Sequence, residues 1–415
     1  MAARDGSCSA SQLNPSAMHT SLLRTLRRPE VSGTLLIALG ALLASCGGDG
    51  SVTDPSKSDT FVSETPQPAG HRIVSIASAF SSTCALLDSG AVDCWGGNVV
   101  GEFGNGTERQ PSDVPVPGAG GLHFAKLYGS TLQGTLCGLD ADARAFCWGN
   151  NPSGAVGNGT TAPALTPSPV AGGYRFTTMT SAYHTCALDE SGQAYCWGMA
   201  LGGALANGNT DPSADALTPT PVVGGAQYTA ITNGLEFTCA LRASGEADCW
   251  GWGAGMGSGP IDRSVSTPTA VDGGLRYSRI SAGPEWVCAL TLAGSPYCWG
   301  KADEWATDFR AAPAPVPTNL TFREIAAISG YGACALTSAG EAYCWWGRGK
   351  PLLVPGHHKW AGLGTGAYPA KSSATAGYSG YTDGGAGFYW SWATGSVNGQ
   401  PVAFPNEPQP LPPIP

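Results

Sequence analysis

Six copies of one short motif constrain the fold of this chain more than any other feature of its sequence. In each copy the second cysteine lies ten positions after the first and a tryptophan follows it, as in CALDESGQAYCWG from Cys186 to Gly198. The copies start at Cys84, Cys137, Cys186, Cys239, Cys288 and Cys334. We therefore expect one structural unit repeated along the chain.

Each copy is typical of a β-hairpin, because two short apolar runs flank turn-forming residues at 189–192. In a register symmetric about Ser191, Cys186 faces Cys196. Directly opposed residues lie about 4.5 to 5.5 Å apart at Cα, which suits a disulfide. Zinc is the alternative, but structural zinc sites use cysteines about two to four residues apart. The expected bridges are Cys84–Cys94, Cys137–Cys147, Cys186–Cys196, Cys239–Cys249, Cys288–Cys298 and Cys334–Cys344.

Both faces of this hairpin are apolar, since Cys186 and Leu188 lie on one face and Ala187 and Trp197 on the other. A sheet inserted between two similar sheets is covered on both faces in this way. The first cysteines are 53, 49, 53, 49 and 46 residues apart. A period of about 50 residues with about four strands per unit is typical of a propeller blade, so we predict an all-β propeller.

The strand that opens each unit has a large residue followed by an apolar one three positions later, as in Phe176 and Met179. This step does not fit strict alternation, so we expect a bulge or a strand end there. A glycine-rich loop such as GEFGNGT from Gly101 and a Pro-Val segment such as Pro221-Val222 complete the unit. These turns and prolines suit loops and edge strands.

The order CAL(x)nG(x)nYCWG, GxxGNGT and PxPVxGG resembles the repeats of the regulator of chromosome condensation family, over about residues 72–347. The resemblance implies a seven-bladed propeller. The chain departs from the family in that the histidine ahead of the hairpin occurs only as His184, and the loop glutamine is missing. Residues 347–400 fit a degenerate seventh blade with Ser379 and Tyr389 at the cysteine positions, completed by the strand near Ile73. A reading-frame error is the alternative.

Residues 1–45 resemble a lipoprotein signal peptide. Arginines precede an apolar run that is too short to span a bilayer well and that ends in Leu43-Ala44-Ser45-Cys46, which resembles a lipobox. Such a peptide is cut before Cys46, and the thiol carries a diacylglycerol. An ordinary export signal with a chance cysteine is the alternative, and either Met1 or Met18 is the start.

The remaining boundaries follow from composition. Residues 46–71 form a polar tether that spans about 25 to 30 Å as a flexible coil. The propeller is expected over 72–400, and the proline-rich tail 401–415 is expected to be disordered. Gly47 leaves no aspartate-type retention signal, so we expect a lipid-anchored, extracytoplasmic protein, on the outer membrane if one is present. Six disulfides suit an oxidising compartment.

The sequence contains no motif for a catalytic centre, a cofactor or a metal ion. The net charge of −9 argues against a nucleic-acid partner. We expect a monomer that binds a protein or a polysaccharide. Its candidate face is made by residues just before the first cysteine of successive units, which would form an aromatic and acidic ring at one end: Tyr183, His184, Glu236, Phe237, Glu285, Trp286 and Tyr331.

Two other hypotheses remain open. The same residues would instead plug the central channel if they point inward. Alternatively, the protein is a polysaccharide hydrolase or lyase that uses Glu236, Glu285 and Glu304, because glycoside hydrolysis needs a pair of carboxylates.

Overall fold

The computed structural model describes residues 71–130, 133–260, 263–301, 309–327, 332–367, 376–397, 400–405 and 408–411. Almost all regular structure in these residues is β-strand. None of their helices is long and apolar enough to cross a membrane. Cys46, Glu304 and Tyr331 lie outside the described residues, as do the predicted signal peptide and nearly all of the tether.

The strands form seven antiparallel sheets, numbered here in chain order. Sheets 1 to 4 consist of β1 (Ile73–Ala79), β2 (Ser82–Leu87), β3 (Val92–Gly96) and β4 (Ser112–Pro117); β5 (Lys126–Gly129), β6 (Thr135–Leu139), β7 (Ala145–Gly149) and β8 (Ala164–Pro169); β9 (Phe176–Ser181), β10 (His184–Asp189), β11 (Ala194–Gly198) and β12 (Ala216–Pro221); and β13 (Tyr228–Asn233), β14 (Phe237–Arg242), β15 (Ala247–Gly251) and β16 (Val265–Ala270).

Sheets 5 to 7 follow the same order and are joined by short connections. They consist of β17 (Tyr277–Ala282), β18 (Trp286–Thr291), β19 (Pro296–Lys301) and β20 (Phe309–Pro315); β21 (Glu324–Ala327), β22 (Gly332–Leu336), β23 (Ala342–Trp346) and β24 (Leu352–Leu353); and β25 (Trp360–Ala367), β26 (Ala376–Thr382), β27 (Gly387–Val397), β28 (Gln400–Pro405) and β29 (Gln409–Pro410). Three short 3-10 helices are η2 (Ala119–Gly121), η3 (Leu201–Gly203) and η4 (Ala254–Met256).

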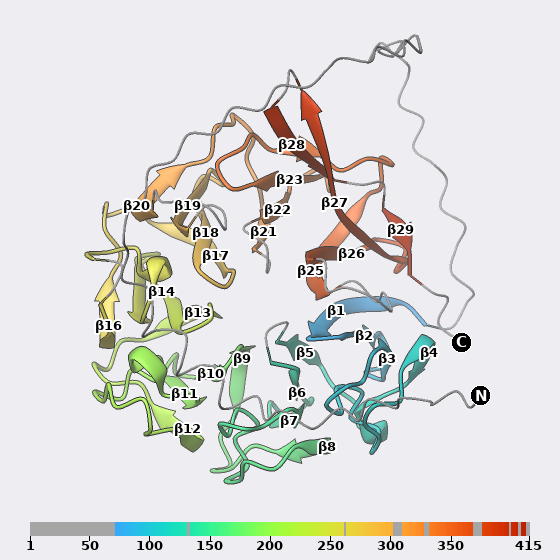
Figure 1. Cartoon of the computed structure of the whole chain (residues 1–415), viewed down its shortest axis with the longest axis vertical. Coiled ribbons are helices and arrows are strands. Elements are labelled where there is room, and N and C mark those ends of the chain that lie inside the picture. The colour runs from blue at the N-terminus through green and yellow to red at the C-terminus, as the bar shows by residue number, and fades with distance from the viewer. Residues whose placement is uncertain are drawn as a thin grey trace, which may run out of the picture. The chain divides into compact units, whose positions relative to one another are not determined.

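The seven sheets form a closed ring (Figure 1). The first strand of each sheet contacts the first strand of the next, and β1 contacts β25, so sheet 7 packs beside sheet 1. This confirms the predicted seven-bladed β-propeller with about four strands per blade. One detail of the prediction is wrong: the strand near Ile73 does not complete the last blade but is the first strand of sheet 1.

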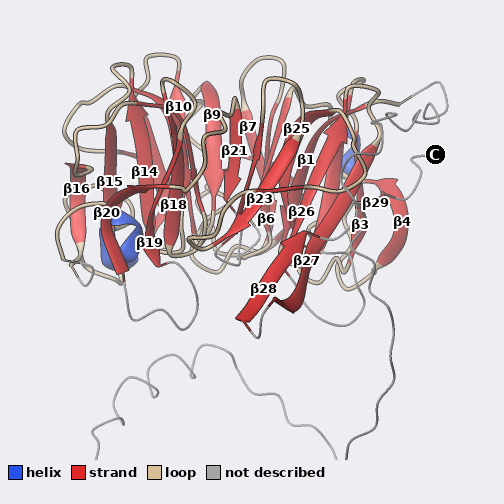
Figure 2. Ribbon diagram, turned by 90° about the horizontal axis from the view of Figure 1, so that it is seen from above, coloured by secondary structure: helices blue, strands red, loops and turns tan. Residues whose placement is uncertain are grey.

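Successive strands run in opposite directions, so the connections between them lie on two faces of the ring (Figure 2). We call the first face the one that carries the turns between first and second strands and between third and fourth strands. The second face carries the turns between second and third strands and the links between sheets. Because β1 is a first strand, it begins at the second face and ends at the first.

The repeated hairpins have the register expected from their sequence. Cys186 is paired with Cys196 and Leu188 with Ala194 across β10 and β11. All six expected bridges are formed, with the two Cα atoms of each pair 4.0 to 4.1 Å apart. In every bridge except that of sheet 5, both cysteines are fully buried. These five bridges therefore belong to the packed core between sheets.

The large residue that opens each sheet and the apolar residue three positions later are separated by the expected irregularity in the strand. The register between the first and second strands shifts between Tyr228 and Ala230, and equivalent shifts follow Ile73, Phe176, Tyr277 and Trp360. In sheets 2 and 6 the large residue, Phe124 or Phe322, instead lies just before the strand. The predicted bulge or strand end is therefore confirmed, and it lets both apolar residues enter the core.

In sheets 2 to 5 the repeated tryptophan joins the sheet to the one before it. Trp148 Nε1 donates a hydrogen bond of 2.9 Å to the carbonyl oxygen of Glu102, in the glycine-rich loop of sheet 1. Trp197, Trp250 and Trp299 make the same bond to the preceding sheet. The loop comes this close because Gly104 has no side chain: a Cβ there would lie 2.7 Å from the Trp148 ring. The tryptophan of the repeated motif and the glycine-rich loop of the preceding sheet therefore hold these neighbouring sheets in contact.

Sheet 7 reaches the same fold without a disulfide. Ser379 and Tyr389 are paired at the positions that cysteines occupy elsewhere, and Trp390 is buried. The tail 401–415, which was expected to be disordered, contains the end of β28 and the whole of β29, and both strands pair with β27. Gln409 and Pro410 pair with β27, and Leu411 is buried with its backbone N–H donated to Gly387. An edge strand tolerates prolines because its outward N–H groups need no partner.

Candidate functional site

The predicted binding ring lies on the first face, but its larger side chains are not exposed. His184, Phe237 and Trp286 open β10, β14 and β18, and each is at most 2% exposed. Each is paired across its hairpin with a glycine, which leaves room for the large side chain to fold into the core. The hypothesis of an exposed ring is therefore wrong for these three residues.

His184 takes part in a buried polar network between sheets 3 and 4. Its Nε2 lies 2.7 Å from the Thr238 hydroxyl, and that hydroxyl donates its own proton to Asn233 Oδ1 at 3.0 Å. Nε2 must therefore be the donor, and the buried Nδ1 has no hydrogen-bond partner among the described residues. Burial lowers the pKa of His184 to about 3, so the ring is neutral and its role is structural.

The residues beside these buried anchors are the ones that solvent reaches. Tyr183, Glu236 and Glu285 are half-buried in the turns between first and second strands. The turn of sheet 4 is bonded to the turn of sheet 5, since the backbone N–H of Leu235 donates to Pro284 at 2.8 Å. The structure thus brings Glu236 and Glu285 to one side of the first face.

Trp252 was missed by the sequence interpretation and lies beside Glu236 on the first face. Its side chain is 41% exposed, and its backbone N–H donates to the carbonyl of Glu236 at 2.8 Å. Gly202 of sheet 3 lies against it, where a Cβ would come within 2.4 Å of the Trp252 Cβ. The sequence did contain a signal for Trp252, which directly follows the Cys-Trp-Gly of sheet 4. The residue at the same place in sheets 1, 2, 3 and 5 is glycine, asparagine, methionine or lysine, so a tryptophan there is unusual.

These residues form a continuous surface over sheets 3 and 4. Met199 joins it, since its backbone N–H donates to Tyr183 at 3.2 Å, and Leu201 is half-buried next to Gly202. We call this surface the aromatic stripe, and its members are Tyr183, Met199, Leu201, Leu235, Glu236 and Trp252. It combines one exposed indole, a tyrosine, three aliphatic or thioether side chains and one carboxylate.

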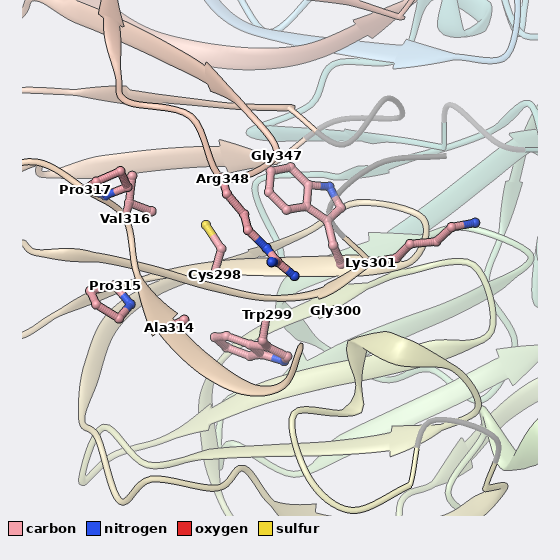
Figure 3. Close-up of a pocket in the computed structure, with 11 residues that line it drawn as sticks. Cys298, Trp299, Gly300, Lys301, Ala314, Pro315, Val316, Pro317, Gly347 and Arg348 are labelled. Atoms are coloured by element: carbon pink, nitrogen blue, oxygen red, sulfur yellow. The ribbon is translucent and has the colours of Figure 1, made fainter. Parts of the chain in front are cut away.

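A cavity of ≈250 Å³ lies between sheets 5 and 6. Its lining includes Trp286, Cys298 and Arg348 (Figure 3). Lys301, also in the lining, holds Glu285 in an ion pair of 3.1 Å between Nζ and Oε2. Two residues of the predicted binding face are therefore close to this cavity. Trp286 lines its wall, and Glu285 forms an ion pair with the lining residue Lys301.

The carboxylates predicted for a hydrolase or lyase are not brought together as a pair among the described residues. The Glu285 carboxylate is engaged by Lys301, and Glu304 lies outside the described residues. Among the described residues no group of three or more metal-ligating side chains comes together. Nothing in this part of the chain supports the hydrolase or lyase hypothesis.

Comparison with known proteins agrees with this architecture. Residues 180–200 match the family model described as regulator of chromosome condensation (RCC1) repeat. Yeast RCC1 (Prp20), solved with Kap60 bound, is similar at a TM-score of 0.60 and 20% identity, covering 71% of this chain and 78% of that one.

Two further solved structures share the fold. Human WBSCR16 gives a TM-score of 0.56 at 17% identity and covers 63% of this chain and 71% of its own. The CRINKLY WD40 ectodomain of the Arabidopsis thaliana receptor kinase ACR4 gives 0.50 at 22% identity, covering 81% of this chain and 99% of that one. The chain is thus a seven-bladed β-propeller that carries the regulator of chromosome condensation repeat.

Proposed function

We propose that this propeller is a protein-binding scaffold, held outside the cytoplasm by a lipid on Cys46, and that the aromatic stripe is its contact surface. Solved relatives of the same fold bind proteins: yeast Prp20 is seen with Kap60 and is described by its binding to Gsp1p and histones. Those partners belong to those proteins. Here they support only the idea that a propeller of this type serves as a binding scaffold.

The stripe is the observation that carries the proposal. A half-exposed tryptophan surrounded by tyrosine, methionine and leucine is the composition of a binding hot spot, because such side chains bury much area with little entropy loss. Trp252 is also held in place, since its backbone is bonded to Glu236 and its side chain rests on Gly202. A preorganised contact surface loses little freedom on binding.

The compartment and the orientation support the same proposal. Six disulfides form where thiols oxidise, outside the cytoplasm. The chain enters the propeller at Ile73, on the second face, whereas the stripe lies on the first face. The tether therefore joins the propeller on the face opposite the stripe. We expect the protein to act as a monomer.

Site-specific photo-crosslinking in intact cells tests the contact surface. A benzophenone amino acid placed at Trp252 is expected to give discrete protein adducts. The matched control is Leu292, which is 66% exposed on the second face. Equal adducts from both positions, or adducts from Leu292 alone, would refute the stripe as the binding surface.

The anchor and the class of ligand have separate tests. Incorporation of an alkyne-labelled fatty acid is expected for the natural chain and absent for Cys46→Ser, and labelling of both would refute the anchor. Immobilised envelope polysaccharide is expected not to retain the protein. Retention that is lost in Trp252→Ala would replace the protein partner by a glycan.

A further inference from the structure

One of the twelve bridged cysteines differs from the rest in its exposure. The other eleven are 0% exposed, whereas Cys298 on β19 is half-buried. Its partner Cys288 on β18 is among the fully buried residues. The Cys288–Cys298 bridge therefore presents one sulfur to its surroundings and hides the other.

In sheets 1 and 4 the connection between the third and fourth strands places backbone carbonyl oxygens against the bridge. The carbonyl oxygen of Glu102 lies 3.9 Å from Cys84 Sγ, and that of Phe103 lies 4.0 Å from Cys94 Sγ. In sheet 4 the carbonyl oxygen of Gly255 lies 3.6 Å from Cys239 Sγ. The corresponding connection of sheet 5, residues 302–308, lies outside the described residues.

Cys298 forms part of the wall of the ≈250 Å³ cavity between sheets 5 and 6, and Cys288 does not line it. The sulfur of Cys298 is drawn among the lining residues in Figure 3. Attack on a disulfide needs an approach to one sulfur along the S–S axis, from the side opposite its partner. Because the cavity reaches Cys298 while Cys288 is buried, a molecule in the cavity has access to the Cys298 sulfur only.

We propose that Cys288–Cys298 is a site of thiol–disulfide exchange with a small thiol that carries a carboxylate. The thiolate of the incoming molecule attacks Cys298 Sγ and forms a mixed disulfide there. The Cys288–Cys298 bond breaks, and Cys288 leaves with the electron pair and takes up one proton from water. No other oxidant or reductant is needed, and the proposal does not depend on the function proposed above.

The carboxylate is inferred from Arg348. This residue is exposed at the cavity rim, and in Figure 3 its guanidinium points in among the lining residues, whereas Lys301 points away from them. A guanidinium pairs with a carboxylate through two parallel hydrogen bonds. Positive charge next to the reacting sulfurs also favours the thiolate form.

Timed exposure of the mature, fully oxidised protein to reduced glutathione tests the site. After acid quenching, peptide mass spectrometry is expected to find glutathione on Cys298 at least about tenfold faster than on any other cysteine, because access controls the rate of exchange. The five other bridges are internal controls within the same molecule. First adducts on another cysteine, or simultaneous opening of all six bridges, would overturn the proposal.

A second arm isolates the recognition of the carboxylate. Arg348→Gln is expected to slow exchange with glutathione about threefold, a typical effect of one exposed ion pair, and to leave exchange with neutral 2-mercaptoethanol unchanged. Lys350→Gln removes the same charge two residues away, at an exposed position outside the cavity lining, and is expected to change neither rate. Equal slowing of both thiols by Arg348→Gln would refute the role of the carboxylate.

Discussion

Sheets 3 and 7 have the same strand order but are held together differently. In sheet 3 a disulfide links Cys186 to Cys196 between the middle strands. In sheet 7 the same positions are Ser379 and Tyr389, which form no bridge. The aromatic pair Phe176 and Trp197 of sheet 3 has its counterpart in sheet 7, where a further ring, Tyr378, joins it. Trp360 lies 4.9 Å from Trp390 between ring centroids, and Tyr378 stacks on Trp390 at 5.9 Å.

The difference shows that the bridges stabilise a blade without specifying it. Both faces of the hairpin are buried, so its register follows from the turn that joins the two strands and not from an alternation of buried and exposed side chains. A disulfide acts mainly by restricting the unfolded chain, whereas aromatic packing acts in the folded state. The two sheets should therefore respond differently to substitution.

The largest effect is expected in sheet 7. Trp390→Ala removes the ring that contacts both Trp360 and Tyr378 and should lower the free energy of unfolding by about 3 to 5 kcal/mol. Chemical denaturation at neutral pH measures this loss. The control Leu353→Ala, at a 40% exposed position of sheet 6, should change it by less than about 0.5 kcal/mol. Similar losses in both variants would show that aromatic packing does not hold sheet 7.

A smaller loss is expected when a bridge is removed from sheet 3. The double variant Cys186→Ser, Cys196→Ser should lose about 2 to 3 kcal/mol, because the closed loop is short. The reciprocal variant Ser379→Cys, Tyr389→Cys should form a bridge in sheet 7, since those residues are directly paired. Mass spectrometry before and after alkylation detects that bridge. Two free thiols after oxidation would contradict the shared register.

The outer strand of sheet 7 gives an intermediate case. Leu411 is 8% exposed and packs with Ile73 of sheet 1, so Leu411→Ala should cost about 2 kcal/mol. Leu122→Ala, at a 40% exposed position, is the matched control. An unchanged unfolding midpoint for Leu411→Ala would mean that the proline-rich end does not help to close the ring.

The smallest effect concerns acid and is confined to sheets 3 and 4. The pKa of His184 falls from 6.5 in the unfolded chain to about 3 in the folded one, so the unfolded state binds a proton that the folded state does not. Stability contributed by neutral His184 is therefore complete above pH 6.5 and is lost as pH falls toward 3, at about 1.4 kcal/mol per pH unit.

Urea denaturation of the natural chain and of His184→Asn at pH 7.5 and 5.5 measures this dependence. The variant is expected to lose less stability between the two pH values than the natural chain does. The exposed His123→Asn is the control and should retain the natural slope. Identical slopes in all three proteins would exclude His184 as the source of the pH dependence.

Prediction from sequence was most accurate where the interactions are local. Cysteine spacing and alternation gave the hairpins and their bridges, and the step from Phe176 to Met179 indicated the bulge. The site was predicted less well. The residues before the first cysteine occupy equivalent places in sheets 3, 4 and 5, but His184, Phe237 and Trp286 are buried at the starts of their strands.

By itself, the sequence determined the repeat and the hairpin register, because these depend on residues within about 50 positions of each other. The number of blades came from the family resemblance, and the closure of the ring joins β1 to β25, which are distant in the sequence. Only the tertiary structure decided which residues reach solvent. Trp252 is exposed and His184 is buried. Cys298 lines a cavity, whereas the equivalent cysteines of the other sheets are fully buried. The physical reason is that both faces of each blade are apolar, so exposure depends on how closely the neighbouring blade and its loop approach.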